Sequence, residues 1–123
     1  MALAEIVGHA TEALRQGRGG DAAMLLTRAL KQPGLTRDEA VQVRCALAEA
    51  WFQQDDIRQA ADALGAPPEE RERLHPLRLS DLWRLHARLA IAKGEPSRAI
   101  ALLGRALKPV SYTHLTLPTI YSV

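Results

Sequence analysis

Four basic side chains between residues 78 and 88 are the best candidates for chemistry in this chain of 123 residues: Arg78, Arg84, His86 and Arg88. Arg84 and Arg88 are four residues apart, which makes them neighbours on the surface of a helix. Guanidinium groups can bind a carboxylate through charge-assisted hydrogen bonds. We therefore predict that these four residues form a partner-binding site for an acidic group. A basic face that only meets solvent is the simpler interpretation of the same spacing.

No other residues have the spacing of a catalytic or metal site. His9, His75 and His86 are far apart and lack Cys, Asp or Glu partners at ligand spacing. The single cysteine, Cys45, excludes an internal disulfide and is interpreted as a packing residue. The segment 17–20 is rich in glycine, but no strand precedes it and no Gly-Lys-Ser/Thr follows, so it predicts a turn. We expect no enzymatic activity, no bound metal and no cofactor.

The elements that position these residues are predicted to be helices. Apolar residues recur at helical spacing in six segments, which Gly, Pro or polar residues separate. Thr36 and Glu39 have the spacing of a capping box, in which each side chain bonds the other residue's backbone N–H. Pro67 follows the end of one helix, and Pro96 suits the first turn of another. The helices form three pairs, at about 2–32, 36–65 and 76–108.

The second helices of the three pairs share a repeated pattern. An alanine is followed four residues later by a leucine, and the successive alanines are almost evenly spaced along the chain: Ala22–Leu26, Ala60–Leu64 and Ala99–Leu103. A small residue lets paired helices approach closely, and the leucine fills the groove beside it. Self-similarity at such a period is typical of a helical repeat protein. An ordinary bundle that merely alternates helices and turns is the competing interpretation.

This pattern resembles the tetratricopeptide repeat family, in which an aromatic and a small residue mark the first helix and a Gly often occupies the turn. The third pair matches through Trp83, Ala87, Ala90, Gly94, Ala99, Leu103 and Ala106. The second matches through Leu47, Ala48, Trp51, Ala60 and Leu64, and the first through Ala10, Ala13, Gly17, Ala22, Leu26 and Ala29. Two residues of the second pair depart from the pattern: Asp55 stands where Gly is usual, and Pro67 replaces the late Ala. The spacing of the alanines exceeds the usual repeat of about 34 residues, so longer connections are expected.

The resemblance covers residues 2–108 and implies an all-α fold of three antiparallel helix-turn-helix hairpins, stacked as a tetratricopeptide-like α-solenoid. It implies a scaffold module that binds a protein or peptide in the groove of its first helices. It also places Trp51 and Trp83 near core positions. Stretched repeats of this kind resemble those ahead of effector domains in bacterial signalling and transcription regulators. We therefore expect residues 1–108 to be the N-terminal regulatory part of a longer bacterial protein, or else the sensor arm of a regulator whose effector domain is missing.

The last residues are of a different kind. The segment from Val110 to Val123, VSYTHLTLPTIYSV, contains no Lys, Arg, Asp or Glu. It resembles an in-frame translation of a transposon-type sequencing adapter. We therefore expect residues 109–123 to be a non-native, irregular or disordered tail behind a truncated repeat domain. Without a further repeat, an apolar face of the last helix should stay open and promote self-association through four residues: Ala99, Ile100, Leu103 and Leu107.

The composition excludes several classes of function. A net charge of +2, with charges of both signs, is too small to predict binding of nucleic acid or an anionic membrane. No segment approaches the roughly 18 apolar residues of a membrane span, and the N-terminus lacks the features of a signal peptide. We expect a cytoplasmic protein whose partner is a protein or peptide. A small helical enzyme would need polar groups that converge in the core, and the helical stripes are almost wholly apolar.

Overall fold

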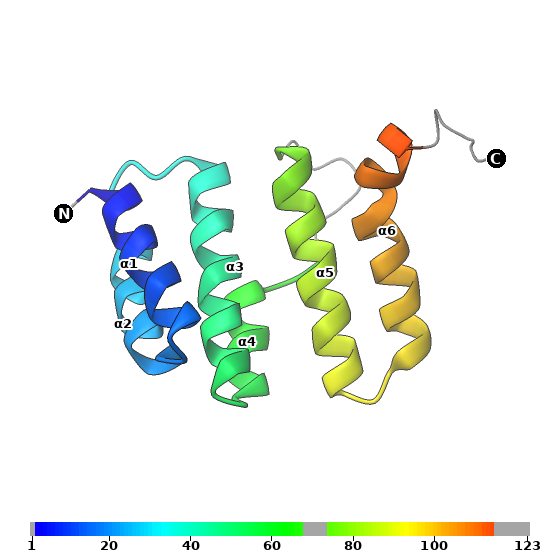
Figure 1. The fold of residues 1–123 in the computed structure, drawn as a ribbon, viewed down its shortest axis with the longest axis horizontal. Helices are drawn as coiled ribbons and strands as arrows, with labels where there is room; N and C mark the ends of the chain where they lie inside the picture. The colour runs from blue at the N-terminus through cyan, green and yellow to red at the C-terminus, as the bar shows by residue number, and fades with distance from the viewer. Residues whose placement is uncertain (1, 68–73, 115–123) are drawn as a thin grey trace.

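The computed structural model describes residues 2–67 and 74–114, with side chains as far as Arg105, and this part of the chain is built from α-helices. The helices are α1 (Leu3–Arg15), α2 (Gly19–Leu30), α3 (Arg37–Gln53), α4 (Ile57–Leu64), α5 (Pro76–Ala92) and α6 (Pro96–His114). Figure 1 shows them arranged in a row, from α1 and α2 at one end to α6 at the other. The predicted all-α fold class is confirmed, since the described residues contain no strand.

The same turn joins α1 to α2, α3 to α4 and α5 to α6. Its central residues are Gly17, Asp55 and Gly94, and all three have a positive φ of 78°, 64° and 76°. In each turn the next backbone N–H bonds the carbonyl five residues earlier: Arg18 to Ala13, Asp56 to Trp51 and Glu95 to Ala90, at 2.8, 2.9 and 2.8 Å. This bond is typical of a Schellman turn, which satisfies the last carbonyls of a helix. The separations between the three turns equal those between the repeated alanines, so the local structure follows the register of the sequence pattern.

Asp55 gives a first test of this turn, because it is the one non-glycine residue with positive φ among the described residues. The left-handed conformation costs an L residue about 1–2 kcal/mol. Asp55→Gly should therefore raise the free energy of unfolding by about 0.5–1 kcal/mol, measured by urea denaturation followed by circular dichroism. Gly94→Ala is the reverse control and should lower it by about 1 kcal/mol, since no atom lies within 4 Å of the added Cβ. A destabilised Asp55→Gly variant would contradict the turn assignment.

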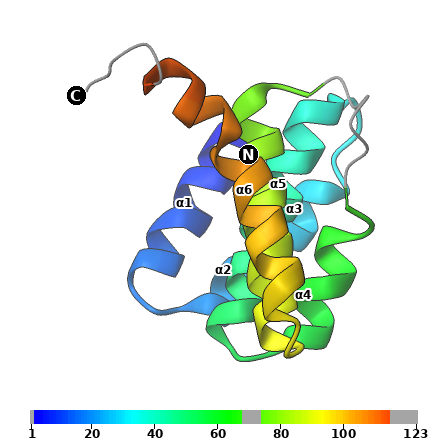
Figure 2. The ribbon, with the colours of Figure 1, turned by 90° about the vertical axis from the view of Figure 1, so that its right-hand side faces the viewer.

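Small residues let the helices approach closely. Six alanines in equivalent positions are at most 2% exposed: Ala10, Ala48 and Ala87 in α1, α3 and α5, and Ala22, Ala60 and Ala99 in α2, α4 and α6. One core cluster joins α1, α2 and α3, a second joins α3, α4 and α5, and a smaller third joins α5 and α6. Figure 2 shows α1 and α4 on opposite sides of the molecule. Because α3 belongs to the first two clusters and α5 to the last two, these two helices connect the parts of the described core.

Side chains cap the helices of the middle pair. The Thr36 hydroxyl accepts a hydrogen bond from the Glu39 N–H at 3.1 Å, and the Glu39 carboxylate accepts one from the Thr36 N–H at 2.9 Å. The predicted capping box is therefore confirmed at the start of α3. At the start of α4, the Asp56 carboxylate accepts a hydrogen bond from the Gln59 N–H at 3.1 Å. These bonds satisfy backbone donors that have no partner inside the helix.

The end of α4 is held by a side chain of α3. Arg44 donates one hydrogen bond to the Ala63 carbonyl at 2.9 Å and another to the Leu64 carbonyl. The chain then leaves the helix at Gly65, with φ 70° and ψ −153°. α4 has only eight residues, so the two carbonyls that Arg44 binds are a large share of the carbonyls at the end of this helix that have no partner within it. Arg44 therefore couples the end of α4 to the middle of α3.

The last helix extends beyond its predicted end. Its backbone is helical from Pro96 to His114. Residues 109–114 are therefore helical, which corrects the expectation of an irregular tail at these positions. Pro109 removes one helical N–H, but residues 110–114 contain neither Pro nor Gly, so no local signal ends the helix there. Residues 115–123 lie outside the described residues. The adapter origin of the tail therefore stays a prediction.

The open apolar face predicted on α6 is present only in part. Ile100 is 72% exposed and Leu103 is 36% exposed, as expected. Ala99 is only 2% exposed, which corrects the prediction, because it packs against α5 in the third core cluster. Ala99 occupies the same position in the repeat as the buried Ala22 of α2 and Ala60 of α4. Like them, it is a small residue that faces the other helix of its pair and lets the two helices approach closely. The side chain of Leu107 lies outside the described part of the chain.

Candidate functional site

All four predicted partner-binding residues lie on α5, which packs against α3, α4 and α6. α5 begins after His75, whose Nδ1 accepts a hydrogen bond from the Leu77 N–H at 3.1 Å, and Pro76 is its first residue. Because the four residues lie at different angles around the helix, their side chains have different surroundings. Three arginines contact residues of α3, whereas His86 is buried at a pocket beside α6. The four residues therefore do not form one basic cluster.

Arg78 and Arg84 take part in ion pairs that connect α5 to α3. Arg78 Nε lies 3.4 Å from Asp38 Oδ2, and Arg84 Nη2 lies 2.9 Å from Glu49 Oε1. Between them, Asp81 is 3.2 Å from Arg78 and 3.7 Å from Arg84. We call these five residues the α3–α5 ion-pair ladder. Because nearby carboxylates balance both guanidinium charges, neither arginine is a free site for an acidic partner. Each half-exposed pair contributes about 0–1 kcal/mol to stability.

Arg88 differs from the other two arginines. Its guanidinium carbon lies 4.6 Å from the centre of the Phe52 ring, a cation–π distance. The Arg88 side chain is exposed, and no described carboxylate lies within ion-pair distance of it. Ile91, one helical turn further on, is 60% exposed. A positive charge without a described carboxylate partner and an exposed apolar side chain are therefore neighbours on α5. The arginines of the α3–α5 ion-pair ladder offer no such combination.

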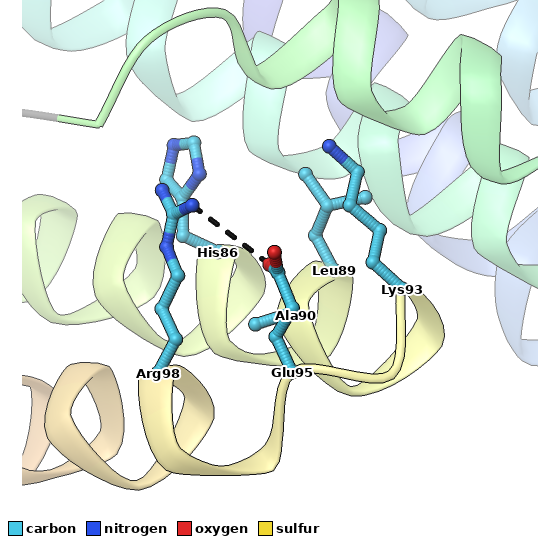
Figure 3. A pocket seen from close by; sticks show the side chains of 6 residues that line it. All are labelled: His86, Leu89, Ala90, Lys93, Glu95 and Arg98. Carbon is cyan, nitrogen blue, oxygen red and sulfur yellow. Dashed lines mark ion pairs between the residues drawn. The ribbon is translucent and has the colours of Figure 1, made fainter.

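His86 is only 4% exposed and does not join the arginines. Burial lowers the pKa of His86 below its ordinary value, and nearby positive charges, that of Arg98 first, lower it further. The imidazole is therefore mainly neutral at pH 7. Figure 3 shows the small pocket at which it lies, with the lining residues drawn as sticks: His86, Leu89, Ala90, Lys93, Glu95 and Arg98.

Cys45 and the two tryptophans have packing roles. Cys45 is 6% exposed, and burial raises the pKa of its thiol to about 12, with a further contribution from the Asp81 carboxylate. The thiol is therefore protonated at neutral pH and cannot act as a thiolate nucleophile. Trp51 packs against both large core clusters. Trp83 packs against the third cluster, and Arg105 lies 5.0 Å from its ring centre.

The sequence interpretation missed the acidic half of the ladder. Asp81 lies three residues after Arg78 and three before Arg84, a spacing that predicts ion pairs on one helix and could have been recognised. Asp38 and Glu49 belong to α3, and no spacing in the sequence connects them to α5. Only the packing of the two helices brings them together.

Metal clusters and membrane-spanning helices are both missing from the described part of the chain. Among the side chains of residues 2–67 and 74–105, no three His, Cys, Asp or Glu are grouped so that they could hold a metal ion. None of the helices in residues 2–67 and 74–114 is both long enough and apolar enough to cross a membrane. No family model, curated protein sequence or solved structure matches the chain.

Proposed function

We propose that the chain is a binding module for a protein or peptide, built from three antiparallel hairpins stacked as a tetratricopeptide-like α-solenoid. The observation that supports this most directly is the recurrence of one left-handed turn after α1, α3 and α5, in register with the buried alanines. Stacked repeats create extended surfaces that bind partners. Contacts of α3 with both α1 and α5 agree with such a surface along the first helices.

The chemistry of this surface favours a partner that combines a carboxylate with an apolar side chain. Arg88 supplies a positive charge that no described carboxylate balances, and Ile91 supplies the exposed apolar contact beside it. An Arg–carboxylate contact is charge-assisted and directional, which gives specificity as well as affinity. Arg78 and Arg84 have a different role in this proposal, because their ion pairs hold α5 against α3. Arg88 is therefore the residue of the predicted set that we expect to bind the partner.

A random peptide library panned on the purified chain tests the proposal. Enriched peptides should contain Asp, Glu or a C-terminal carboxylate next to an apolar residue. Arg88→Glu should then weaken the binding of such a peptide at least about tenfold in fluorescence anisotropy, because a hydrogen bond to a charged group contributes about 1.5–3 kcal/mol. Arg58→Glu is the matched control, since it makes the same charge change at an exposed position of α4.

Two results would contradict the proposal. If no peptide is enriched, the assignment as a peptide-binding module is wrong. If Arg88→Glu and Arg58→Glu weaken binding equally, the effect comes from net charge, and the surface around Arg88 is not the site.

A further inference from the structure

The imidazole of His86 has a buried nitrogen without a partner. Its Nε2 atom forms no hydrogen bond with any described group, although the residue is only 4% exposed. A buried polar atom without a hydrogen bond is costly, so nearly all such atoms in folded proteins have a partner. The adjoining pocket holds about 20 Å³, which is room for one water-sized group. A partner for Nε2 can therefore come from this pocket.

Packing alone does not require a histidine at this position. In the register of the repeat, His86 of α5 corresponds to Leu47 of α3, which lies one repeat earlier in the chain. Leu47 is 7% exposed and belongs to the first core cluster. The same place in the neighbouring pair is thus filled by an apolar side chain that leaves no polar atom unsatisfied. The histidine adds a polar group to a position that the fold can fill with leucine.

Two positive side chains line the pocket, and a third positive charge acts on His86 from α3. Lys93 at the end of α5 and Arg98 of α6 line it, and Arg44 of α3 is close enough to lower the pKa of His86. The one carboxylate among the lining residues is Glu95, whose Oε1 lies 3.8 Å from Arg98 Nη1. Figure 3 shows this ion pair beside the imidazole. The C-terminus of α5 and the N-terminus of α6 both lie at this pocket, so their opposite helix dipoles offset each other and the side chains decide the charge. The balance of charge around Nε2 is therefore positive.

We propose that the His86 pocket binds an oxyanion, either a phosphate or a carboxylate group, with one oxygen accepting a hydrogen bond from Nε2. The pocket admits one water-sized atom, so the rest of the anion remains at its mouth, where Lys93 and Arg98 contact it. His86 carries a proton in the complex, since an imidazolium binds an anion better than a neutral ring. Affinity therefore rises as the pH falls. This site does not depend on the peptide-binding surface around Arg88, and either can fail without the other.

Nuclear magnetic resonance of the imidazole Cε1–H groups tests the proposal on the full chain. The His86 resonance, identified by its loss in His86→Leu, is followed through a pH titration in sodium phosphate, in sodium acetate and in sodium chloride of equal ionic strength. The pKa of His86 should be higher in phosphate or acetate than in chloride. His9 and His75 are exposed and do not line the pocket, so they are internal controls whose resonances should not differ between the three salts. Comparison of the phosphate and acetate arms identifies which oxyanion the pocket prefers.

Two further variants separate the pocket from a general effect of charge. Arg98→Gln should weaken phosphate binding about tenfold, and Glu95→Gln should strengthen it about threefold, because it removes the competing carboxylate. His86→Leu should fold, since Leu47 fills the equivalent position, and should lose any phosphate-dependent rise in melting temperature. The proposal is overturned if neither phosphate nor acetate raises the pKa of His86 above its value in chloride. It is also overturned if the resonances of His9 and His75 differ between the salts by as much as that of His86.

Discussion

Leu85→Ala is expected to lower the free energy of unfolding by about 2–5 kcal/mol, one of the largest effects of any single change in the described chain. Leu85 is 0% exposed and lies in the cluster that joins α3, α4 and α5. The change removes buried methyl groups and leaves a cavity, and both effects destabilise the folded state. Urea denaturation followed by circular dichroism measures the loss. A destabilisation of this size would show that α5 is a full part of the core.

The matched control is Leu77→Ala on the same helix. Leu77 is 59% exposed, so its truncation should change the free energy of unfolding by less than about 0.5 kcal/mol. Both variants lose the same atoms and place the same residue in α5, and their main difference is burial, although Leu77 lies in the first turn of the helix and Leu85 in its middle. Equal effects of the two changes would mean that α5 does not pack on α3 and α4 as the structure has it.

Gly65→Ala is the second substitution with a large expected effect: it should lower the free energy of unfolding by about 2–4 kcal/mol. The backbone of Gly65 has φ 70° and ψ −153°, a region that costs other residues about 1–3 kcal/mol. An added Cβ would also collide with the Arg44 guanidinium, which is hydrogen-bonded to the carbonyls of Ala63 and Leu64. A shift of Nη2 weakens its hydrogen bond to the Leu64 carbonyl, and a hydrogen bond to a charged group contributes about 1.5–3 kcal/mol when it is intact. Thermal and urea unfolding both measure the change.

Gly34→Ala separates the two causes. Gly34 has a φ of 79°, but no atom lies within 4 Å of an added Cβ, so only the backbone strain of about 1 kcal/mol is expected. In an Arg44→Ala background, Gly65→Ala should likewise lose the part of its effect that comes from the collision. If Gly65→Ala costs no more than Gly34→Ala in the wild-type chain, Arg44 does not hold the end of α4.

Much of the fold could be predicted because its signals are local. The capping box at Thr36 and Glu39 lies within the first turn of α3, and the turns at Gly17 and Gly94 are marked by the residue type that a positive φ favours. Asp55 is not a residue type that favours a positive φ as glycine does. Only its position in the repeat register indicates that it occupies the same turn. The end of α6 could not be predicted, because the absence of charged residues after Lys108 indicated a change of sequence but not an end of the helix.

The candidate site was predictable only within one helix. The spacing of Arg84 and Arg88 correctly makes them neighbours on α5, yet one pairs with Glu49 and the other lies over Phe52. Both partners belong to α3, far earlier in the sequence, and their positions depend on how the helices cross. The burial of His86 could have been inferred by comparison with Leu47 in the register. That comparison uses the repeat, which is the strongest signal in this sequence.

The α3–α5 ion-pair ladder has a consequence for how the chain responds to dissolved salt. At physiological ionic strength the Debye length is about 8 Å, and it shortens as salt is added, so half-exposed pairs such as Arg84 with Glu49 weaken. The apolar contacts around Leu85 are not screened in this way. As ions accumulate, α5 would rest on α3 mainly through the apolar contacts of the second core cluster, and the edge formed by the ion pairs would be free to open. The placement of α5 against α3 would then depend on the ionic medium as well as on the sequence.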